Sequence, residues 1–233
     1  MIILDKKEKN MPEIDFMSGL HKSTSRDYLA RVNDKNFPKA KAAELAKKWD
    51  FDYWDGDRRI NYGGYNYIEG RWEKVARAIL EHYKLPPKSK ILDVGCGKGF
   101  LMFDILKVRS DLEIYGLDIS SYAIENSKKE IRENIVLGNS NNLPWPDNYF
   151  DLVISITTLH NLYNFDLFKS LKEIERVSRF YKYICVESYR NELEKANLLY
   201  WQVTCEAFNT PKEWEWIFNQ TGYTGDYSYI YFE

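Results

Sequence analysis

The stretch at residues 90–101 constrains the fold of this chain more than any other part of it. An apolar run at 91–94 ends in three alternating glycines, Gly95, Gly97 and Gly99, after which apolar residues recur with helical spacing. This order predicts a strand, a tight turn and a helix. Glycines suit such a turn because they adopt positive φ angles and let a ligand approach the backbone closely. The start of the helix adds unpaired N–H groups that can bind a polar ligand.

The spacing of these glycines separates two kinds of nucleotide site. It is G-x-G-x-G, whereas dinucleotide-binding proteins carry G-x-G-x-x-G. Asp93 lies two residues before the first glycine, where a carboxylate suits an amino group better than a phosphate. Asp118 ends the next predicted strand, a position from which a carboxylate accepts hydrogen bonds from ribose hydroxyls. The combination predicts a nucleoside-containing cofactor, although for Asp118 alone an ordinary strand-ending aspartate is an alternative.

Strand and helix patterns alternate from residue 90 onwards. Strands are predicted at 90–95, 113–118, 135–138, 150–156, 181–187 and 227–232, and helices at 98–109, 121–132, 164–178, 191–207 and 211–220. Alternation of this kind predicts an α/β fold with a doubly wound, mostly parallel sheet and helices on both faces. Such sheets bind ligands beyond the carboxyl ends of their strands, where the strand order reverses.

We expect the chain to divide into an N-terminal helical or lid segment, residues 1–69, and a cofactor-binding domain, residues 70–233, which together form one compact unit. Helical spacing predicts a helix at 39–49 and another at 71–83. Between them, residues 51–67 mix aromatic, acidic, arginine and glycine residues without a regular period. Loops of this length in compact domains are typically lids or binding segments. A structural loop packed on the sheet by its aromatic residues is the alternative.

Composition limits the partners and the compartment. The 233 residues carry a net charge of −2, so no basic excess points to nucleic acid. The three cysteines and the three histidines are dispersed, which predicts free thiols in a reducing compartment and no metal site. Because neither a signal peptide nor an apolar run of ~20 residues is found, we expect a cytoplasmic protein without membrane contact. The oligomeric state is left open.

The glycine motif and its neighbours resemble class I S-adenosylmethionine-dependent methyltransferases of the small-molecule type. The resemblance covers roughly residues 70–190 and is carried by residues 94–99, Asp93, Asp118, Asn139, Ser140 and residues 150–153. It implies a Rossmann-like methyltransferase fold with S-adenosyl-L-methionine as the cofactor and S-adenosyl-L-homocysteine as its product. The family's sheet usually ends in an antiparallel pair, whereas residues 223–233 leave room for one clear strand.

The resemblance also implies how the cofactor lies. The glycine turn packs against its methionine and ribose, Asp93 lies near its ammonium group, and Asp118 and Ile119 face ribose and adenine. Asn139 takes a place beside the adenine that is more often aspartate in the family, and its amide oxygen can accept from the adenine amino group. The predicted cofactor residues are therefore Asp93, Gly95, Gly97, Gly99, Asp118, Ile119, Asn139, Ser140, Ile156 and Thr157, with Tyr62 and Gly64 from the loop at 51–67.

Methyl transfer needs alignment of the nucleophile, the methyl group and the sulfur, and exclusion of water. A base is needed only when the nucleophile must lose a proton. His160 follows the strand at 150–156, and its ordinary pKa of ~6.5 suits proton transfer. A packing or loop-orienting histidine is the alternative. Glu187 ends the strand at 181–187 and could act as base, bind substrate or cap the next helix.

Contacts to the methyl acceptor are predicted from residues around the same rim. The candidates are Tyr65, Arg71, Tyr189, Arg190 and Trp201, and Arg58 and Arg59 could also meet a phosphate or carboxylate. Solvated surface charge is the alternative for the arginines, and core packing is the alternative for the aromatic residues.

The predicted function is methyl transfer to an oxygen or nitrogen of a polar small molecule. A precursor of a cell-surface polysaccharide is one candidate, because residues 52–67 resemble small methyltransferases of such pathways. A methyltransferase that acts on protein or RNA is a first alternative. A non-catalytic, S-adenosylmethionine-binding regulatory protein is a second.

Overall fold

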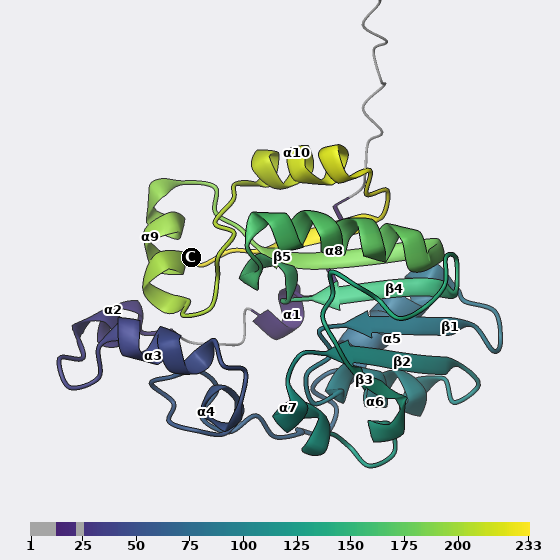
Figure 1. Ribbon diagram of the computed structural model, residues 1–233, viewed down its shortest axis with the longest axis horizontal. Helices are drawn as coiled ribbons and strands as arrows, with labels where there is room; N and C mark the ends of the chain where they lie inside the picture. The colour runs from purple at the N-terminus through teal and green to yellow at the C-terminus, as the bar shows by residue number, and fades with distance from the viewer. Residues whose placement is uncertain (1–12, 22–25) are drawn as a thin grey trace, which may run out of the picture.

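A six-stranded parallel sheet forms the centre of the computed structural model, which describes residues 13–21 and 26–233 (Figure 1). The strands are β1 (Lys90–Val94), β2 (Glu113–Asp118), β3 (Ile135–Leu137), β4 (Phe150–Ile156), β5 (Ser178–Glu187) and β6 (Asp226–Ile230). Their order in the sheet is β3-β2-β1-β4-β5-β6. The doubly wound sheet is therefore confirmed, and its switch point lies at the carboxyl ends of β1 and β4.

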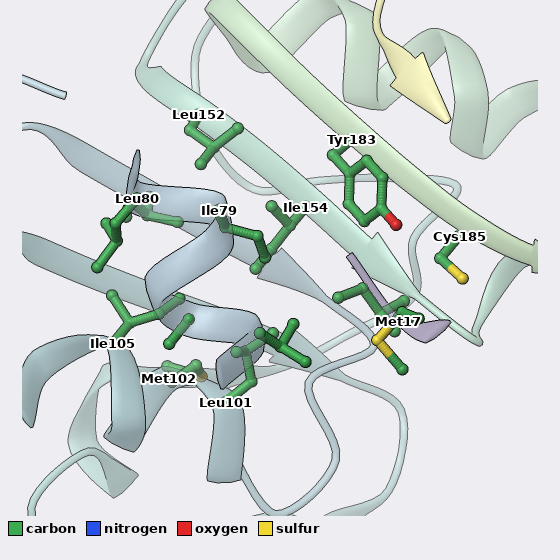
Figure 2. Close-up of a cluster of buried hydrophobic side chains, with 14 of the residues drawn as sticks. Met17, Ile79, Leu80, Leu101, Met102, Ile105, Leu152, Ile154, Tyr183 and Cys185 are labelled. Atoms are coloured by element: carbon green, nitrogen blue, oxygen red, sulfur yellow. The ribbon is translucent and has the colours of Figure 1, made fainter. Parts of the chain in front are cut away.

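Helices cover both faces of the sheet because successive strand residues point to opposite sides. The covering helices are α5 (Glu73–Tyr83), α6 (Phe100–Val108), α8 (Asn164–Val177) and α10 (Pro211–Thr221). Leu152 joins Ile79 and Ile105 in the core beneath α5 and α6, which Figure 2 shows. Its neighbour Val153 joins Ile174 in the core beneath α8 and α10. Both cores leave the carboxyl ends of the strands accessible to a ligand.

α7 (Ser121–Glu125) and α9 (Glu192–Trp201) are much shorter than predicted. α7 is followed by turns and by the 3-10 helix η1 (Arg132–Asn134). Only the first part of the range predicted as a helix, 121–132, is therefore α-helical. α9 ends before residue 207 because the backbone N–H groups of residues 206–207 both donate to the carbonyl of His160. This pairing draws the chain after α9 back across the carboxyl end of β4.

The sheet ends in one parallel strand and not in the antiparallel pair usual for the resembled family. β6 pairs with β5 from Tyr183–Asp226 to Glu187–Ile230. On the far side of β6, the N–H of Ile14 donates to the carbonyl of Tyr227 at 2.8 Å. The N-terminal segment thereby covers part of an edge that would otherwise offer unpaired backbone groups.

The N-terminal helices gather beyond the carboxyl ends of the strands. They are α1 (Ser18–His21), α2 (Tyr28–Asn33), α3 (Lys39–Ala46) and α4 (Phe51–Trp54). Figure 1 shows the strands pointing toward the end of the molecule where α2, α3, α4 and α9 lie. The ring of Tyr28 meets that of Trp201 in α9 edge-on at 6.1 Å.

Part of the predicted N-terminal segment can be compared with the structure. The helix predicted at 39–49 is confirmed up to residue 46, and the loop predicted at 51–67 begins with a single helical turn, α4. Residues 1–12 and 22–25 lie outside the described part of the chain. Among the residues that are described, no helix combines the length and apolar character that a bilayer crossing requires.

Candidate active site

A cavity of about 530 Å³ opens at the carboxyl ends of β1, β2, β4 and β5. The glycine turn after β1 and the residues that follow β2 and β4 line one part of it, and residues from the N-terminal cover and from the end of α9 line the rest. Its volume falls within the ~300–1,000 Å³ typical of small-molecule sites. The switch point predicted from the sequence therefore holds a space of the size that small ligands occupy.

Two glycines of the turn form the floor of this cavity. Gly95 and Gly97 adopt φ angles of 81° and 55°. A Cβ on Gly97 would lie 2.6 Å from the Trp54 ring, and one on Gly95 would lie 2.1 Å from the Thr158 hydroxyl oxygen. Neither position has room for a side chain. The third glycine, Gly99, lies outside the cavity lining. It forms the N-cap of α6, and a Cβ there would meet Ile131.

Two buried aspartates stand beside the turn with different surroundings. Asp118 accepts from the N–H of Gly97 at 2.6 Å and from the N–H of Ser120 at 2.9 Å, which orients it and leaves lone pairs for a further donor. Asp93 accepts no hydrogen bond from any residue in the described part of the chain, although it is only 4% exposed. Burial, with the charge of Asp118 adding to it, raises the pKa of Asp93 to about 7. A buried carboxyl that faces a cavity without a partner suits a cationic ligand group.

A buried lysine fastens the N-terminal cover onto the glycine turn. The ammonium group of Lys98 donates to both carboxylate oxygens of Asp55, at 2.8 and 2.7 Å, and to the carbonyl of Tyr65 at 2.9 Å. The hydroxyl of Tyr122 also donates to Asp55 at 2.8 Å. Burial acts to raise the pKa of Asp55, but these hydrogen bonds outweigh it and the pKa is lowered. The carboxylate is therefore ionised, and the lysine inside the turn is paired with it.

Aromatic side chains from the cover complete the roof. Trp54 donates from its indole nitrogen to the hydroxyl of Ser120 at 2.9 Å, and Tyr62 stacks on its ring with centroids 5.6 Å apart. Tyr65 stacks on Phe100 of α6 at 5.0 Å. The segment predicted as a loop over the cofactor is thus held over the turn by stacking as well as by the ion pair.

A buried histidine and a buried glutamate meet at the ends of β4 and β5. The N–H of Glu187 donates to Nδ1 of His160 at 3.3 Å, so the neutral ring carries its proton on Nε2, which lies 3.4 Å from Oε2 of Glu187. Burial lowers the pKa of His160 to about 3 and raises that of Glu187 to about 8. The short distance is therefore a contact between neutral groups at pH 7 and not an ion pair.

The two carboxyl oxygens of Glu187, Oε1 and Oε2, have different surroundings. The side-chain amide of Gln202 donates to Oε1. Oε2 is buried and has no hydrogen-bond partner among the residues that the structure describes. Both residues line the cavity. A buried carboxyl with one unpaired oxygen, protonated at pH 7, thus lies at the wall of a space that also contains the glycine turn.

The rim between these groups includes a strained residue. Thr157, directly after β4, has a φ angle of 55°, which is rare for a β-branched side chain. Its N–H donates to the carbonyl of Cys185 in β5 at 2.9 Å, which holds the conformation. Such outliers gather at ligand-binding sites.

Most residues predicted for the site line this one cavity. They are Tyr62, Gly64, Tyr65, Arg71, Asp93, Gly95, Gly97, Asp118, Ile119, Asn139, Ser140, Ile156, Thr157, His160, Glu187 and Trp201. Besides Gly99, the structure places Tyr189 and Arg190 outside the lining. Arg190 pairs instead with Glu194 and Glu233, because the turn into α9 directs it away from the rim.

Several residues of the cavity were not predicted. Trp54 and Gln202 line it, and their place beside or within predicted segments was the available signal. Lys98 lies in the glycine turn but outside the lining, and it was not predicted either. No spacing rule connects Asp55 with Lys98, since 43 positions separate them. Arg26 lines the cavity from a segment whose sequence pattern carried no functional signal.

Comparison with known proteins identifies relatives over the same part of the chain. The methyltransferase domain family matches residues 85–222. A demethylmenaquinone methyltransferase from Symbiobacterium thermophilum is 32% identical over 139 residues, 55% of this chain and 55% of that protein. A tRNA (carboxymethyluridine(34)-5-O)-methyltransferase from Arabidopsis thaliana is 32% identical over 130 residues, 55% of this chain and 30% of that protein. The chain thus spans about half the length of the first of these relatives and less than a third of the second.

Solved structures show the same fold. The MccD protein aligns with a TM-score of 0.52 and 20% identity, over 66% of this chain and 72% of that one. The YcgJ protein from Bacillus subtilis aligns with a TM-score of 0.50 and 18% identity, over 63% of this chain and 66% of that one. The domain match spans more than half of the sequence and coincides with the parallel sheet and its glycine turn. The chain therefore belongs to the class I S-adenosylmethionine-dependent methyltransferase family.

Proposed function

We propose that the protein transfers the methyl group of S-adenosylmethionine to an oxygen or nitrogen of a polar small molecule. The observation that carries the proposal is that one roofed cavity joins the glycine turn to the buried carboxyl of Glu187. A relative named demethylmenaquinone methyltransferase supports a small acceptor. In this proposal residues 1–69 act as the cover, and residues 70–233 hold the cofactor.

The residues present fit this cofactor. Asp93 is a buried acid without a partner in the described chain and suits its ammonium group. Asp118 keeps lone pairs for the ribose hydroxyls, and the backbone of Gly95 and Gly97 can be approached closely. Ile119 and Asn139 line the cavity where the adenine would lie. When bound, the cofactor supplies an activated methyl group.

Within the pair at the strand ends, Glu187 fits the role of base better than His160. The lone pair of His160 on Nδ1 already accepts from the backbone, and its other nitrogen carries a proton. Oε2 of Glu187 is free to take a proton from an acceptor hydroxyl or amine. A cation held in the same cavity favours the carboxylate form of Glu187. His160 then positions Glu187 through the backbone hydrogen bond and the Nε2 contact.

Ribose binding by Asp118 is tested by its replacement with alanine. We expect the affinity for S-adenosylhomocysteine, measured by isothermal titration calorimetry, to fall about 10- to 100-fold, because hydrogen bonds to a charged group are lost. Arg190→Ala is the matched control and should bind as wild type, since Arg190 lies outside the cavity lining. Unchanged affinity in Asp118→Ala would show that the ribose lies elsewhere.

Cofactor affinity should also depend on pH through Asp93. Below its pKa of about 7 the carboxyl is neutral and cannot pair with an ammonium group, so affinity should fall as pH falls. The limiting slope is about tenfold per pH unit. Titrations with S-adenosylhomocysteine between pH 5.5 and 7 measure it, and Asp93→Asn should bind weakly with no slope in that range. A wild-type profile as flat as that of the variant would remove Asp93 from the ammonium site.

The alternatives give different results in the same measurements. A regulatory protein would bind S-adenosylmethionine but transfer no methyl group to any acceptor. An enzyme of RNA would transfer the methyl group to RNA, and tRNA is the acceptor that the name of the Arabidopsis thaliana relative gives for that protein. The polysaccharide precursor stays a prediction, since no feature of the cavity singles it out. No binding of S-adenosylmethionine or S-adenosylhomocysteine would overturn the proposed function altogether.

A further inference from the structure

Three arginine side chains from separate parts of the N-terminal cover meet at one tryptophan of α9. The guanidinium carbons of Arg26, Arg31 and Arg58 lie 5.7, 4.8 and 5.5 Å from the ring centre of Trp201. Arg26, Arg58 and Trp201 line the cavity. Three permanent positive charges therefore gather around one indole ring at the wall of the candidate active site.

Two of these charges, those of Arg31 and Arg58, are not matched by carboxylates in the described part of the chain. Arg31 donates to the carbonyls of Ile60 and Arg58, at 3.3 and 3.5 Å, and Arg58 donates to the carbonyl of Asn61. Within residues 13–21 and 26–233, no carboxylate lies within 4.0 Å of the guanidinium groups of Arg31 and Arg58. Burial and the charge of Arg58 lower the pKa of Arg31 to about 10. Crowding like charges in this way disfavours the unliganded state and is typical of binding sites.

Many of the other described arginines are paired with a carboxylate. Five of them lie against a carboxylate: Arg59 on Asp57, Arg77 on Glu73, Arg109 on Asp111, Arg176 on Glu173 and Arg190 on Glu194. Arg31 and Arg58 depart from this pattern beside the cavity, and Arg71, which lines the same cavity, has no carboxylate within 4.0 Å among the described residues either. The missing negative charge is therefore expected from a ligand.

The cluster also lies next to the group proposed as the base. Gln202 follows Trp201 directly and donates to the side chain of Glu187. The positive charge of Arg26 also reaches Glu187 and acts to lower the pKa of that carboxyl. A ligand seated at the arginines would thus place its neighbouring atoms within the same part of the cavity as Glu187.

We infer that the methyl acceptor carries an oxyanion, a carboxylate or phosphate group, that binds Arg58 beside Trp201 while its nucleophile faces Glu187. The inference rests on the proposed function. Guanidinium groups bind such oxyanions through paired, charge-assisted hydrogen bonds. Arg31, behind Arg58, adds to the positive potential without lining the cavity.

The test uses the full chain saturated with S-adenosylhomocysteine. Inorganic phosphate, acetate and a short single-stranded RNA are titrated separately by calorimetry. We expect phosphate or acetate to bind wild type, to bind Arg58→Gln at least tenfold more weakly, and to bind Arg58→Lys with intermediate affinity, because lysine keeps the charge but loses the fork. Arg77→Gln, which removes an exposed arginine of α5, should bind as wild type. RNA should bind no more tightly than phosphate.

The outcomes separate this inference from the proposed function. Failure of wild type to bind S-adenosylhomocysteine overturns the proposed function. Binding of S-adenosylhomocysteine without anion binding, or with equal anion affinity in wild type and Arg58→Gln, overturns the anionic acceptor alone. RNA that binds more tightly than phosphate and depends on Arg58 overturns the small-molecule class. If Arg58→Gln no longer binds S-adenosylhomocysteine, the anion titrations are repeated with Arg31→Gln. An anion affinity of Arg31→Gln equal to that of wild type then overturns the inference.

Discussion

Replacement of Glu187 by glutamine is expected to lower kcat by about 10²- to 10⁴-fold, because the acceptor loses the group that takes its proton. Glutamine keeps the shape of the side chain and the contact to Gln202, but its amide cannot accept a proton between pH 6 and 9.5. The measurement is transfer of labelled methyl groups to the acceptor between pH 6 and 9.5. The wild-type rate should rise with pH and then level off, with a midpoint below about 8 because the bound cation lowers the pKa of Glu187, whereas the variant should lack this rise.

The matched control is His160→Asn. Because His160 is assigned a positioning role, its replacement should cost less than tenfold in kcat and shift the midpoint of the pH profile without removing it. A larger loss in His160→Asn than in Glu187→Gln would reverse the two roles. Cofactor affinity should be retained by both variants, which distinguishes a chemical defect from a binding defect.

The same carboxyl predicts a pH-dependent stability of the unliganded protein. Its pKa in the folded protein, about 8, lies above the ordinary value of 4.5 expected after unfolding. The folded state therefore binds the proton more tightly, and this stabilisation is present below pH 4.5 and is lost as pH rises through about 8. In Glu187→Gln the fall in melting temperature over this range should be smaller than in wild type. Equal falls would show that Glu187 is not buried as the structure has it.

Replacement of Asp55 by asparagine is expected to destabilise the protein by about 3–5 kcal/mol, since it leaves the ammonium group of Lys98 buried without its charged partner. The Lys98 side chain is only 4% exposed, against 21% for Asp55. Because this pair fastens the cover onto the glycine turn, we also expect S-adenosylhomocysteine to bind at least about tenfold more weakly. Chemical denaturation measures the first effect, and calorimetry measures the second.

Two further variants control this experiment. Asp55→Asn combined with Lys98→Met should recover part of the stability, because no charge is then buried alone, but it should not recover the cofactor affinity. Glu69→Gln breaks the exposed pair between Glu69 and Lys107 and should leave both quantities unchanged. If Asp55→Asn behaved like Glu69→Gln, the ion pair would not hold the cover in place.

The sheet, the switch point and most of the cofactor end of the cavity could be predicted from local patterns. The apolar runs of β1 and β4, the helical spacing of α5 and α8 and the glycine spacing at Gly95 and Gly97 each lie within a few residues along the chain. Hydrophobic periodicity and positive φ angles act at that range, so they leave a signal in the sequence. Asp93 and Asp118 could be predicted as site residues because each lies at or near the end of a predicted strand.

The rest was decided by contacts between segments far apart in the chain. Three such contacts depend on packing that no local period encodes. They are the pair of Lys98 with Asp55, the hydrogen bond from the backbone of Glu187 that sets the protonation of His160, and the approach of Arg31 and Arg58 to Trp201. The same reason explains why Gly99 and Arg190, both placed in the site by sequence reasoning, lie outside its lining. Local spacing thus predicted the end of the cavity that is proposed for the cofactor. Tertiary packing decided which side chains line the rest of the cavity and which hydrogen bonds they make.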